Sequence, residues 1–182
     1  MSTIELAMPT ILRQEGHYSA QKNDPGGATN YGISLRFLLS IGAVDHNNLP
    51  GGDINHDGKV DVLDIKDMTP EEATQLYYSY FWLPNNYGRI QDQVIATKVF
   101  SLSINMIYHA ENKCLQRAVR AASGVTLTDD GVIGETTLNA VNACDSKLLL
   151  AALKSESAGY YRSIKYAGSE DYLTGWLNRA YD

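Results

Sequence analysis

The chain has 182 residues, of which 44% are hydrophobic and 20% charged, values typical of one globular domain or of a domain with a small appended lobe. This composition excludes a mainly disordered or fibrous chain. The formal net charge of −6 argues against nucleic acid as a partner, because phosphates are bound by basic surfaces. No apolar run approaches the roughly 20 residues that cross a bilayer, so we expect no membrane span.

The first predicted element is a helix over residues 2–15. Apolar residues recur in it at helical spacing, and Gly16 is expected to end it. Ser2 and Glu5 have the spacing of a capping box, and Pro9 is expected either to kink the helix or to begin its second part. Residues 17–34 are polar and rich in Gly, Asn and Pro, which predicts a loop or a small hairpin region.

A short helix is expected over residues 35–41, and its run Phe37-Leu38-Leu39 is expected to be buried. Residues 42–64 resemble a loop. The sequence Thr69-Pro70-Glu71-Glu72 then predicts a helix start, with Thr69 as the cap, Pro70 in the first position and Glu72 closing a capping box.

The remaining chain is predicted to be helical. The helix that begins after Thr69 should run to about Trp82, and further helices are expected over residues 91–106, 111–123, 135–143, 146–166 and 170–180. The predicted fold is therefore mainly α, with one irregular or β-containing region early in the chain. That region is where we expect the functional site.

Three side chains between residues 15 and 34 have the chemistry of glycosidic bond hydrolysis. This reaction needs one protonated carboxyl group and a second group that activates or orients water. Glu15 is predicted at the C-terminal end of a helix, where unpaired carbonyls disfavour an ionised carboxylate. Asp24 and Thr29 follow in a Gly-rich turn that can fold back toward it. By spacing alone, a glutamate at a helix end is more often simply solvated.

The same segment carries a family resemblance. Glu15-Gly16-x-Tyr18, followed by Asp24-Pro25-Gly26-Gly27-Ala28-Thr29-Asn30-Tyr31-Gly32-Ile33-Ser34, resembles the signature of glycoside hydrolase family 108, the N-acetylmuramidases of phages and bacteria. The similarity continues in the motifs Met68 to Ala73, Leu76 to Trp82, Phe100 to Asn105, Cys114 to Gly134, and Gly175 to Arg179. It covers nearly the whole chain in the right order.

The resemblance implies roles for particular residues. Glu15 matches the catalytic glutamate, the proton donor, and Asp24 and Thr29 fall where related phage-type lysozymes keep an Asp and a Thr. Within the matching motifs, the residues expected to bind substrate are Asn30, Tyr31, Trp82 and Asn105. Two positions depart from the family pattern: His17 stands where a second Gly is usual, and Ser101 where an Asp is usual.

A separate motif lies in the predicted loop. The segment Asp53-Ile54-Asn55-His56-Asp57-Gly58-Lys59-Val60-Asp61-Val62-Leu63-Asp64 fits the calcium-binding loop of EF-hands and resembles that of dockerin modules. The expected metal-binding residues are Asp53, Asn55, Asp57, Lys59, Asp61 and Asp64, with Gly58 at the sharp turn. The alternative is an acidic, solvated turn without a metal. The motif predicts one bound Ca²⁺, structural or regulatory.

Taken with the resemblance, the expected architecture is a lysozyme-like helical part over residues 1–108 and a C-terminal, peptidoglycan-binding-like helical part over residues 109–182. The two are expected to pack as one unit. The segment Asp130 to Gly134 resembles peptidoglycan-binding modules, although a tight turn between two packed helices would explain it equally well.

The expected function is hydrolysis of the β-1,4 bond between N-acetylmuramic acid and N-acetylglucosamine in bacterial peptidoglycan, by a monomeric phage-type endolysin. A lytic transglycosylase, or a non-catalytic calcium-dependent wall-binding module, are the alternatives. No signal peptide is recognised, so we expect the protein in the host cytoplasm before its release to the cell wall. The cysteines, Cys114 and Cys144, are expected to stay reduced.

Overall fold

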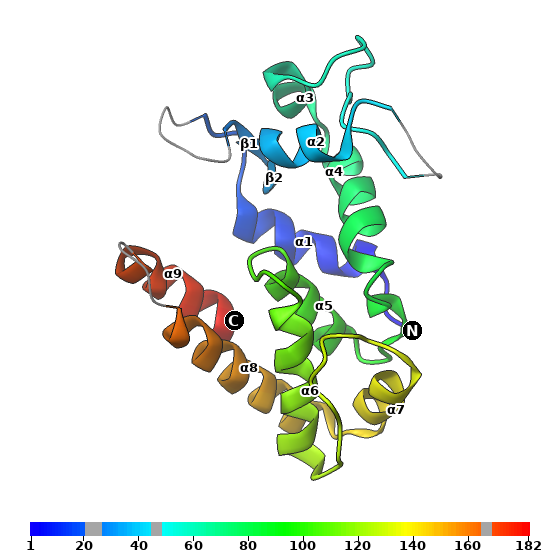
Figure 1. Ribbon diagram of the computed structural model, residues 1–182, viewed down its shortest axis with the longest axis vertical. Helices are drawn as coiled ribbons and strands as arrows, with labels where there is room; N and C mark the ends of the chain where they lie inside the picture. The colour runs from blue at the N-terminus through cyan, green and yellow to red at the C-terminus, as the bar shows by residue number, and fades with distance from the viewer. Residues whose placement is uncertain (21–26, 45–48, 165–168) are drawn as a thin grey trace. The chain divides into compact units, whose positions relative to one another are not determined.

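The computed structural model describes residues 1–20, 27–44, 49–164 and 169–182. It confirms a mainly helical fold with one small sheet (Figure 1). The chain divides into two compact units, one formed by residues 7–84 and the other by residues 1–6 with 85–182. No helix among the described residues is both long enough and apolar enough to cross a membrane.

The unit of residues 7–84 contains most of α1 (Ile4–Glu15), a hairpin of β1 (Thr29–Asn30) and β2 (Ile33–Ser34), α2 (Leu35–Ile41), α3 (Val62–Asp67) and α4 (Pro70–Tyr77). The helix of α4 continues as a π-helical turn over Tyr78–Trp82. Its core is formed by apolar side chains from each helix, among them Ile11, Ile33, Leu38, Ile65 and Leu76.

Local capping explains where the helices of this unit begin. Thr69 and Glu72 form the predicted capping box, and Pro70 takes the first helical position. Ser34 caps α2 by accepting a hydrogen bond from the Phe37 amide. The prediction that residues 42–64 form a loop holds for residues 42–44 and 49–61, and a second capping box at Asp61 starts α3; residues 45–48 lie outside the described residues.

Two predictions for the early helices were wrong. Ser2 does not cap α1 with Glu5: the helix begins at Ile4, one residue too late for that box, and the Ser2 hydroxyl donates a 2.7 Å hydrogen bond to the carbonyl of Ile90. Of the two alternatives for Pro9, the start of a second helical part is excluded, because Pro9 lies inside a single helix. In the run from Phe37 to Leu39 only Leu38 is buried, while Leu39 is 57% exposed, because neighbouring residues of a helix point in different directions.

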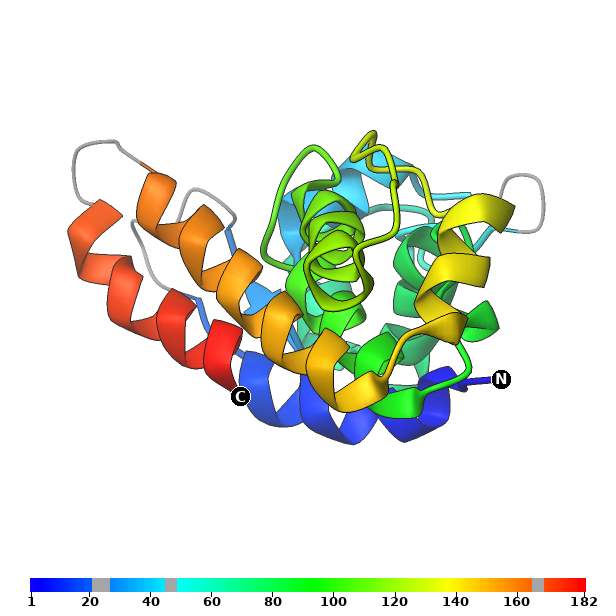
Figure 2. The ribbon, with the colours of Figure 1, turned by 90° about the horizontal axis from the view of Figure 1, so that it is seen from below.

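The second unit is built from α5 (Gln93–Ser103), α6 (Ala110–Ser123), α7 (Glu135–Ala143), α8 (Ser146–Ser163) and α9 (Ser169–Tyr181), with a short 3₁₀ turn at Tyr87–Arg89. The helix α8 packs against both α6 and α9. Figure 1 and Figure 2 show α8 and α9 side by side along their length. Of the two cysteines, Cys114 is buried on α6 and Cys144 follows α7, and neither forms a disulfide.

The C-terminal end of α9 is held by two lysines. Lys98 on α5 donates a hydrogen bond to the carbonyl of Arg179, and Lys154 on α8 donates one to the carbonyl of Tyr181. Cations at these last carbonyls also interact favourably with the helix dipole. Lys98 is only 6% exposed, and burial lowers its pKa to about 8.

This burial predicts a pH-dependent stability. Between about pH 8 and the ordinary lysine pKa of 10.5, the unfolded chain binds a proton at Lys98 that the folded chain does not. The contribution of Lys98 to stability should therefore increase as pH rises through this window. We expect the difference in melting temperature between the wild type and Lys98→Met to increase, in favour of the wild type, from neutral pH to about pH 9.5. The corresponding difference for Lys147→Met, which changes an exposed lysine, should stay constant. A pH-independent difference for Lys98→Met would contradict this.

Candidate active site

The candidate site is built around the end of α1. Glu15 is the last residue of this helix, and Gly16 follows with φ +73°, its amide bonded to the carbonyl of Leu12 at 3.1 Å. A left-handed glycine is the usual helix stop, so Gly16 ends α1 as the sequence predicted. The Glu15 side chain is half-buried.

A two-residue hairpin turn lies against Glu15. The strands β1 and β2 pair Asn30 with Ile33, so that Tyr31 and Gly32 form the turn with φ of 50° and 80°. Two positive φ values define the tight hairpin turn that favours glycine. A Cβ added to Gly32 would lie 2.7 Å from Cγ of Glu15 and 2.9 Å from its Cβ. Only glycine therefore allows the turn to approach the glutamate this closely.

Tyr77 fixes this turn from α4. Its ring is fully buried, and its hydroxyl donates a 2.9 Å hydrogen bond to the carbonyl of Tyr31. The same hydroxyl would lie 2.4 Å from a Cβ at Gly32. Tyr31 itself is a non-glycine residue in the left-handed region, a conformation that surrounding contacts must stabilise. Glu15, the Tyr31–Gly32 turn and Tyr77 thus form one packed group.

The other predicted residues of this region have different positions. Thr29 lies in β1, where its amide and carbonyl both bond to Ser19 at 2.8 Å. Asn30 is 5% exposed, and its side-chain amide donates a 3.0 Å hydrogen bond to the carbonyl of Ile65. A sugar contact by this amide would require breaking that bond, so the geometry gives Asn30 a role in positioning the hairpin. Asp24 lies outside the described residues.

Two of the predicted substrate residues come further along the chain. Trp82 is 3% exposed at the end of the π-helical turn, where it is part of the core. Asn105 is exposed just after α5, in the other compact unit. Of the four predicted substrate residues, only Tyr31 combines partial exposure with a direct connection to the glutamate's surroundings.

His17, one of the two departures from the family pattern, is exposed, and its ring meets that of Tyr31 edge-on with centroids 5.9 Å apart. Ser101, the other, is buried on α5, where its carbonyl accepts a 3.1 Å hydrogen bond from the Arg179 guanidinium. His17 therefore contacts the turn that covers Glu15, whereas Ser101 holds α9 in the second unit.

The acidic loop of residues 53–64 is ordered by its own side chains. Asp64 is completely buried and accepts hydrogen bonds from the amides of Ile54, Asn55 and Asp61. Two further side chains accept hydrogen bonds from loop amides. Asp53 accepts from the amides of Asp57 and Gly58, and Asp57 accepts from the amide of Lys59. Across the part of the chain that the structure describes, no three His, Cys, Asp or Glu side chains gather as a metal site.

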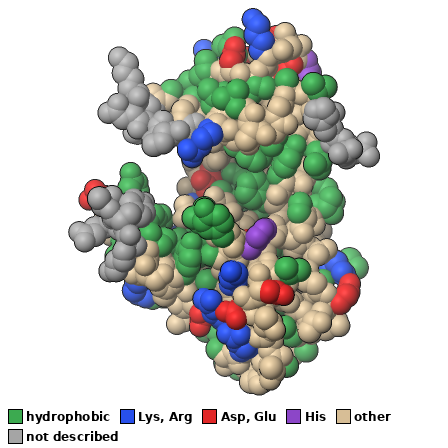
Figure 3. All heavy atoms as spheres, in the orientation of Figure 1, with side chains coloured by type: hydrophobic (Ala, Val, Ile, Leu, Met, Phe, Trp, Pro, Cys, Tyr) green, Lys and Arg blue, Asp and Glu red, His purple; other side chains and the backbone are tan. Residues whose placement is uncertain are grey.

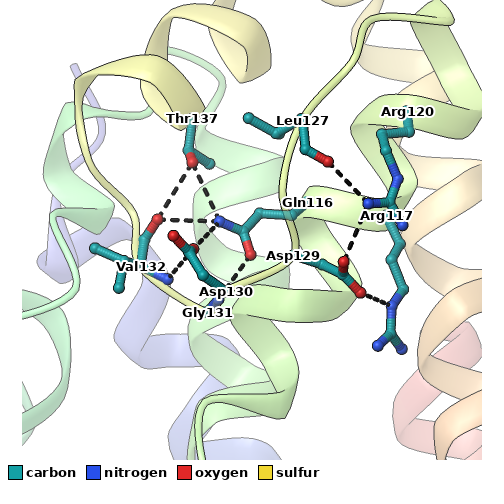
Figure 4. Close-up of polar contacts among 9 residues, drawn as sticks. All are labelled: Gln116, Arg117, Arg120, Leu127, Asp129, Asp130, Gly131, Val132 and Thr137. Atoms are coloured by element: carbon teal, nitrogen blue, oxygen red, sulfur yellow. Dashed lines mark hydrogen bonds and ion pairs between the residues drawn. The ribbon is translucent and has the colours of Figure 1, made fainter.

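In the second unit, Gln116 organises the segment between α6 and α7 (Figure 4). Its amide nitrogen donates to Asp130, Val132 and Thr137, and its oxygen accepts a 2.8 Å hydrogen bond from the Gly131 amide. Asp129 pairs with Arg117 and Arg120, which lowers the pKa of its carboxyl to about 2. The segment from Asp130 to Gly134 is therefore fixed to α6 by a buried amide, a geometry that fits both of the predicted alternatives, a binding motif and a tight turn.

Comparison with known proteins agrees with this organisation. Residues 8–106 match the model of glycosyl hydrolase 108, and residues 111–181 match that of a predicted peptidoglycan domain. A structure of Brucella abortus SagA is 25% identical, with a TM-score of 0.71, over 97% of this chain and 88% of that one. No curated protein sequence matches the chain significantly.

The fold and these matches define a glycoside hydrolase that acts on peptidoglycan. The family match covers more than half of the chain. The chain belongs to glycosyl hydrolase family 108.

Gly32 and Tyr77 belong to the candidate site although the sequence alone did not single them out. Gly32 is part of the motif quoted above, but only the hairpin register shows that it faces Glu15. Tyr77 lies in the quoted motif from Leu76 to Trp82. Its hydrogen bond to Tyr31 joins residues 46 positions apart, and no local sequence pattern predicts a contact over that separation.

Proposed function

We propose that the protein is an N-acetylmuramidase that hydrolyses the β-1,4 bond between N-acetylmuramic acid and N-acetylglucosamine, with Glu15 as the general acid. The observation that supports this role is the packing of Glu15 beneath the Tyr31–Gly32 turn. There the half-buried glutamate has its Cβ and Cγ packed closely against Gly32 of the turn. A general acid needs a fixed position to deliver its proton to the leaving oxygen.

In this proposal the hairpin region supplies the second catalytic group. Asp24, with Thr29 on β1, orients the water that attacks the sugar, because an inverting or retaining hydrolase requires a second group beside its acid. Tyr31 supplies a ring at the edge of the site that can pack on a sugar face. The hydrogen bond from the Tyr77 hydroxyl to the carbonyl of Tyr31 holds the backbone of Tyr31 in place.

The nature of the product ends tests the reaction. Purified peptidoglycan digested by the protein should give fragments that end in reducing N-acetylmuramic acid, because water attacks the anomeric carbon. Mass spectrometry distinguishes these ends from 1,6-anhydro-muramic ends by the mass of one water. Anhydro ends would show a lytic transglycosylase, in which no water attacks, and the roles given to Asp24 and Thr29 would be abandoned. Undigested peptidoglycan would favour a non-catalytic wall-binding module.

We propose as well that the loop of residues 53–64 binds one Ca²⁺. The donor set supports this, since Asp53, Asn55, Asp57 and Asp61 supply the hard oxygen ligands that Ca²⁺ prefers, and Lys59 stands where these loops use a backbone carbonyl. Each carboxylate oxygen has two lone pairs, so one that accepts an amide hydrogen bond can also bind a cation. Asp64 is buried with no cationic side chain within ion-pair distance among the described residues. Buried carboxylates are ordinarily paired or bound to metal.

Calcium removal gives the test of this second proposal. A chelator should lower the melting temperature by roughly 5–10 °C, because an ion that binds only the folded chain at a hundredfold excess over its Kd stabilises it by about 2.7 kcal/mol. Calcium should restore the melting temperature better than magnesium. Asp53→Asn should melt like the chelated protein and ignore added calcium, whereas Asp67→Asn, on α3 just beyond the loop, should keep the calcium response. If the chelator does not change the melting temperature and calorimetry detects no calcium binding, the loop is an acidic turn stabilised by hydrogen bonds from its own amides.

A further inference from the structure

A pocket of about 240 Å³ opens in the second unit, away from the residues assigned so far. It is lined by Ile107, Tyr108, Ala110, Lys113, Arg117 and Tyr160. This volume is below the roughly 300–1,000 Å³ of pockets that take a whole drug-sized ligand. It therefore suits one or two residues of a larger molecule.

The lining of the pocket contains two basic side chains and no acidic one. Lys113 and Arg117 lie four residues apart on α6, so both side chains project from one face of the helix. Arg117 is paired with Asp129 at 2.6 Å, whereas Lys113 has no ion-pair partner among the described residues. No Asp or Glu lines the pocket, in a chain whose net charge is −6. The local charge therefore favours an anionic group.

Two acids lie near the pocket without lining it, Glu156 on α8, which interacts electrostatically with Arg117, and Glu111 on α6. Glu111 is 3% exposed and lies with His109, at 3.8 Å from its Nδ1, and with the hydroxyl of Tyr87, at 3.5 Å. Burial raises the pKa of this carboxyl, so its ionised form is disfavoured as well. Figure 3 shows Lys and Arg side chains on the lower helices interspersed with Asp and Glu, with hydrophobic side chains and with a histidine.

The rim of the pocket is held in an unusual backbone conformation. Tyr108 and His109 are consecutive non-glycine residues with φ of 55° and 56°, and Tyr108 is 85% exposed. Each such residue costs on the order of 1–3 kcal/mol, which is typical of binding and active sites rather than of ordinary loops. The hydroxyl of Tyr160 hydrogen-bonds to the backbone of Ile107 and so anchors this rim to α8. The result is a tyrosine ring displayed beside an unpaired lysine.

We propose that this pocket binds a carboxylate of the peptidoglycan stem peptide, with Lys113 contacting the carboxylate and Tyr108 packing on the adjoining peptide or sugar. Lys113, Arg117 and Tyr160 lie within the segment that matches a peptidoglycan domain. The inference rests on peptidoglycan as the substrate and deepens the proposed function, because it makes the second unit the part that recognises the stem. A stem peptide offers both features that the pocket requires, since it carries free carboxylates and is attached to an N-acetylated sugar.

The binding test uses a ligand that the proposed muramidase does not cleave. A soluble disaccharide tripeptide, N-acetylglucosaminyl-N-acetylmuramyl-peptide, contains no bond from N-acetylmuramic acid to a following N-acetylglucosamine. Calorimetric titration of the full chain should show binding. Binding should fall about tenfold or more in Lys113→Ala, as loss of a hydrogen bond to a charged group implies. Lys113→Arg should restore most of it, and Lys147→Ala, which removes an exposed lysine from α8, should bind like the wild type.

Two ligand controls identify the group that is bound. The same muropeptide with its peptide carboxyls amidated should bind about as weakly to the wild type as the unmodified ligand binds to Lys113→Ala. A chitin tetrasaccharide, which lacks carboxylates, should not distinguish Lys113→Ala from the wild type. The inference is overturned if the muropeptide does not bind, if the amidated ligand binds equally well, or if Lys113→Ala and Lys147→Ala behave alike.

The outcome is separable from that of the proposed reaction. In the Glu15→Gln background, Lys113→Ala should still lower muropeptide binding about tenfold, because the proposed contact is made by Lys113 and not by Glu15. If the muropeptide binds through Lys113 but peptidoglycan is not cleaved, the muramidase proposal fails and the stem-binding site stands. If peptidoglycan is cleaved to reducing muramic ends but the muropeptide shows no dependence on Lys113, the reverse holds.

Discussion

Replacing Glu15 with glutamine should reduce the rate of peptidoglycan cleavage by about two to four orders of magnitude, the contribution that general acid catalysis makes to such reactions. Glutamine has the same shape as glutamate, so it keeps the packing beneath Gly32 and removes only the transferable proton. The melting temperature should therefore change little. Turbidity loss of a cell-wall suspension, measured at several enzyme concentrations, gives the rate.

The matched control for this variant is Glu5→Gln. Glu5 lies in the first turn of the same helix and is exposed, so the substitution makes an identical chemical change far from the Tyr31–Gly32 turn. It should keep nearly full activity and lose only the few tenths of a kcal/mol, about 0.3–1, that an acid at a helix N-terminus contributes. If Glu15→Gln retained more than a tenth of the wild-type rate, Glu15 would not be the general acid and another carboxyl group would have to be sought.

The helices were predictable where local hydrogen bonds determine them. The capping box of Thr69 and Glu72, with Pro70 between, joins residues three positions apart, and the structure contains it as predicted. The box expected for Ser2 and Glu5 has the same spacing but does not form. Ser2 instead binds the carbonyl of Ile90, 88 residues away. A long-range partner replaced a local one, and the local sequence contains no sign of that partner.

The site was predictable in outline for a similar reason. The motif from Glu15 to Ser34 located both the helix end and the hairpin region, because Gly16 and Gly32 mark the points where the backbone turns. The sequence did not show which face of the hairpin meets Glu15, since this depends on register. It also did not show that Asn30 is used to hold the hairpin onto Ile65 rather than displayed to substrate.

The acidic loop illustrates a different limit. The spacing of its oxygen-bearing residues predicts ligands that surround an ion, and all of those residues were treated as equivalent. In the structure Asp64 differs from the rest, because it is buried and binds three loop amides, whereas Asp57 is exposed. Asp64→Ala would remove these bonds with or without calcium, and for this reason Asp53→Asn is the sharper test of metal binding.

Replacing Gly32 with alanine should disable the site although it adds only one methyl group. The new Cβ would lie 2.4 Å from the Tyr77 hydroxyl and 2.7 Å from Cγ of Glu15, so the tyrosine, the glutamate or the turn must move. Such overpacking costs about 1–3 kcal/mol, and the left-handed φ of 80° adds about 1–2 kcal/mol for any residue with a Cβ. For a chain of this length, each kcal/mol lowers the melting temperature by roughly 2–4 °C.

Gly124→Ala separates the two causes. Gly124, which ends α6, is left-handed with φ 72° and ψ 2°, but nothing lies within 4 Å of its added Cβ, so this variant carries the backbone strain without the collision. It should lose a few degrees of stability and keep its activity. Gly32→Ala should melt lower still. Assayed well below its melting temperature, it should cleave peptidoglycan about a hundredfold more slowly, because displacing a catalytic group by about 1 Å has an effect of that size. Equal activities of the two variants would mean that the contact between the turn and Glu15 does not position the acid.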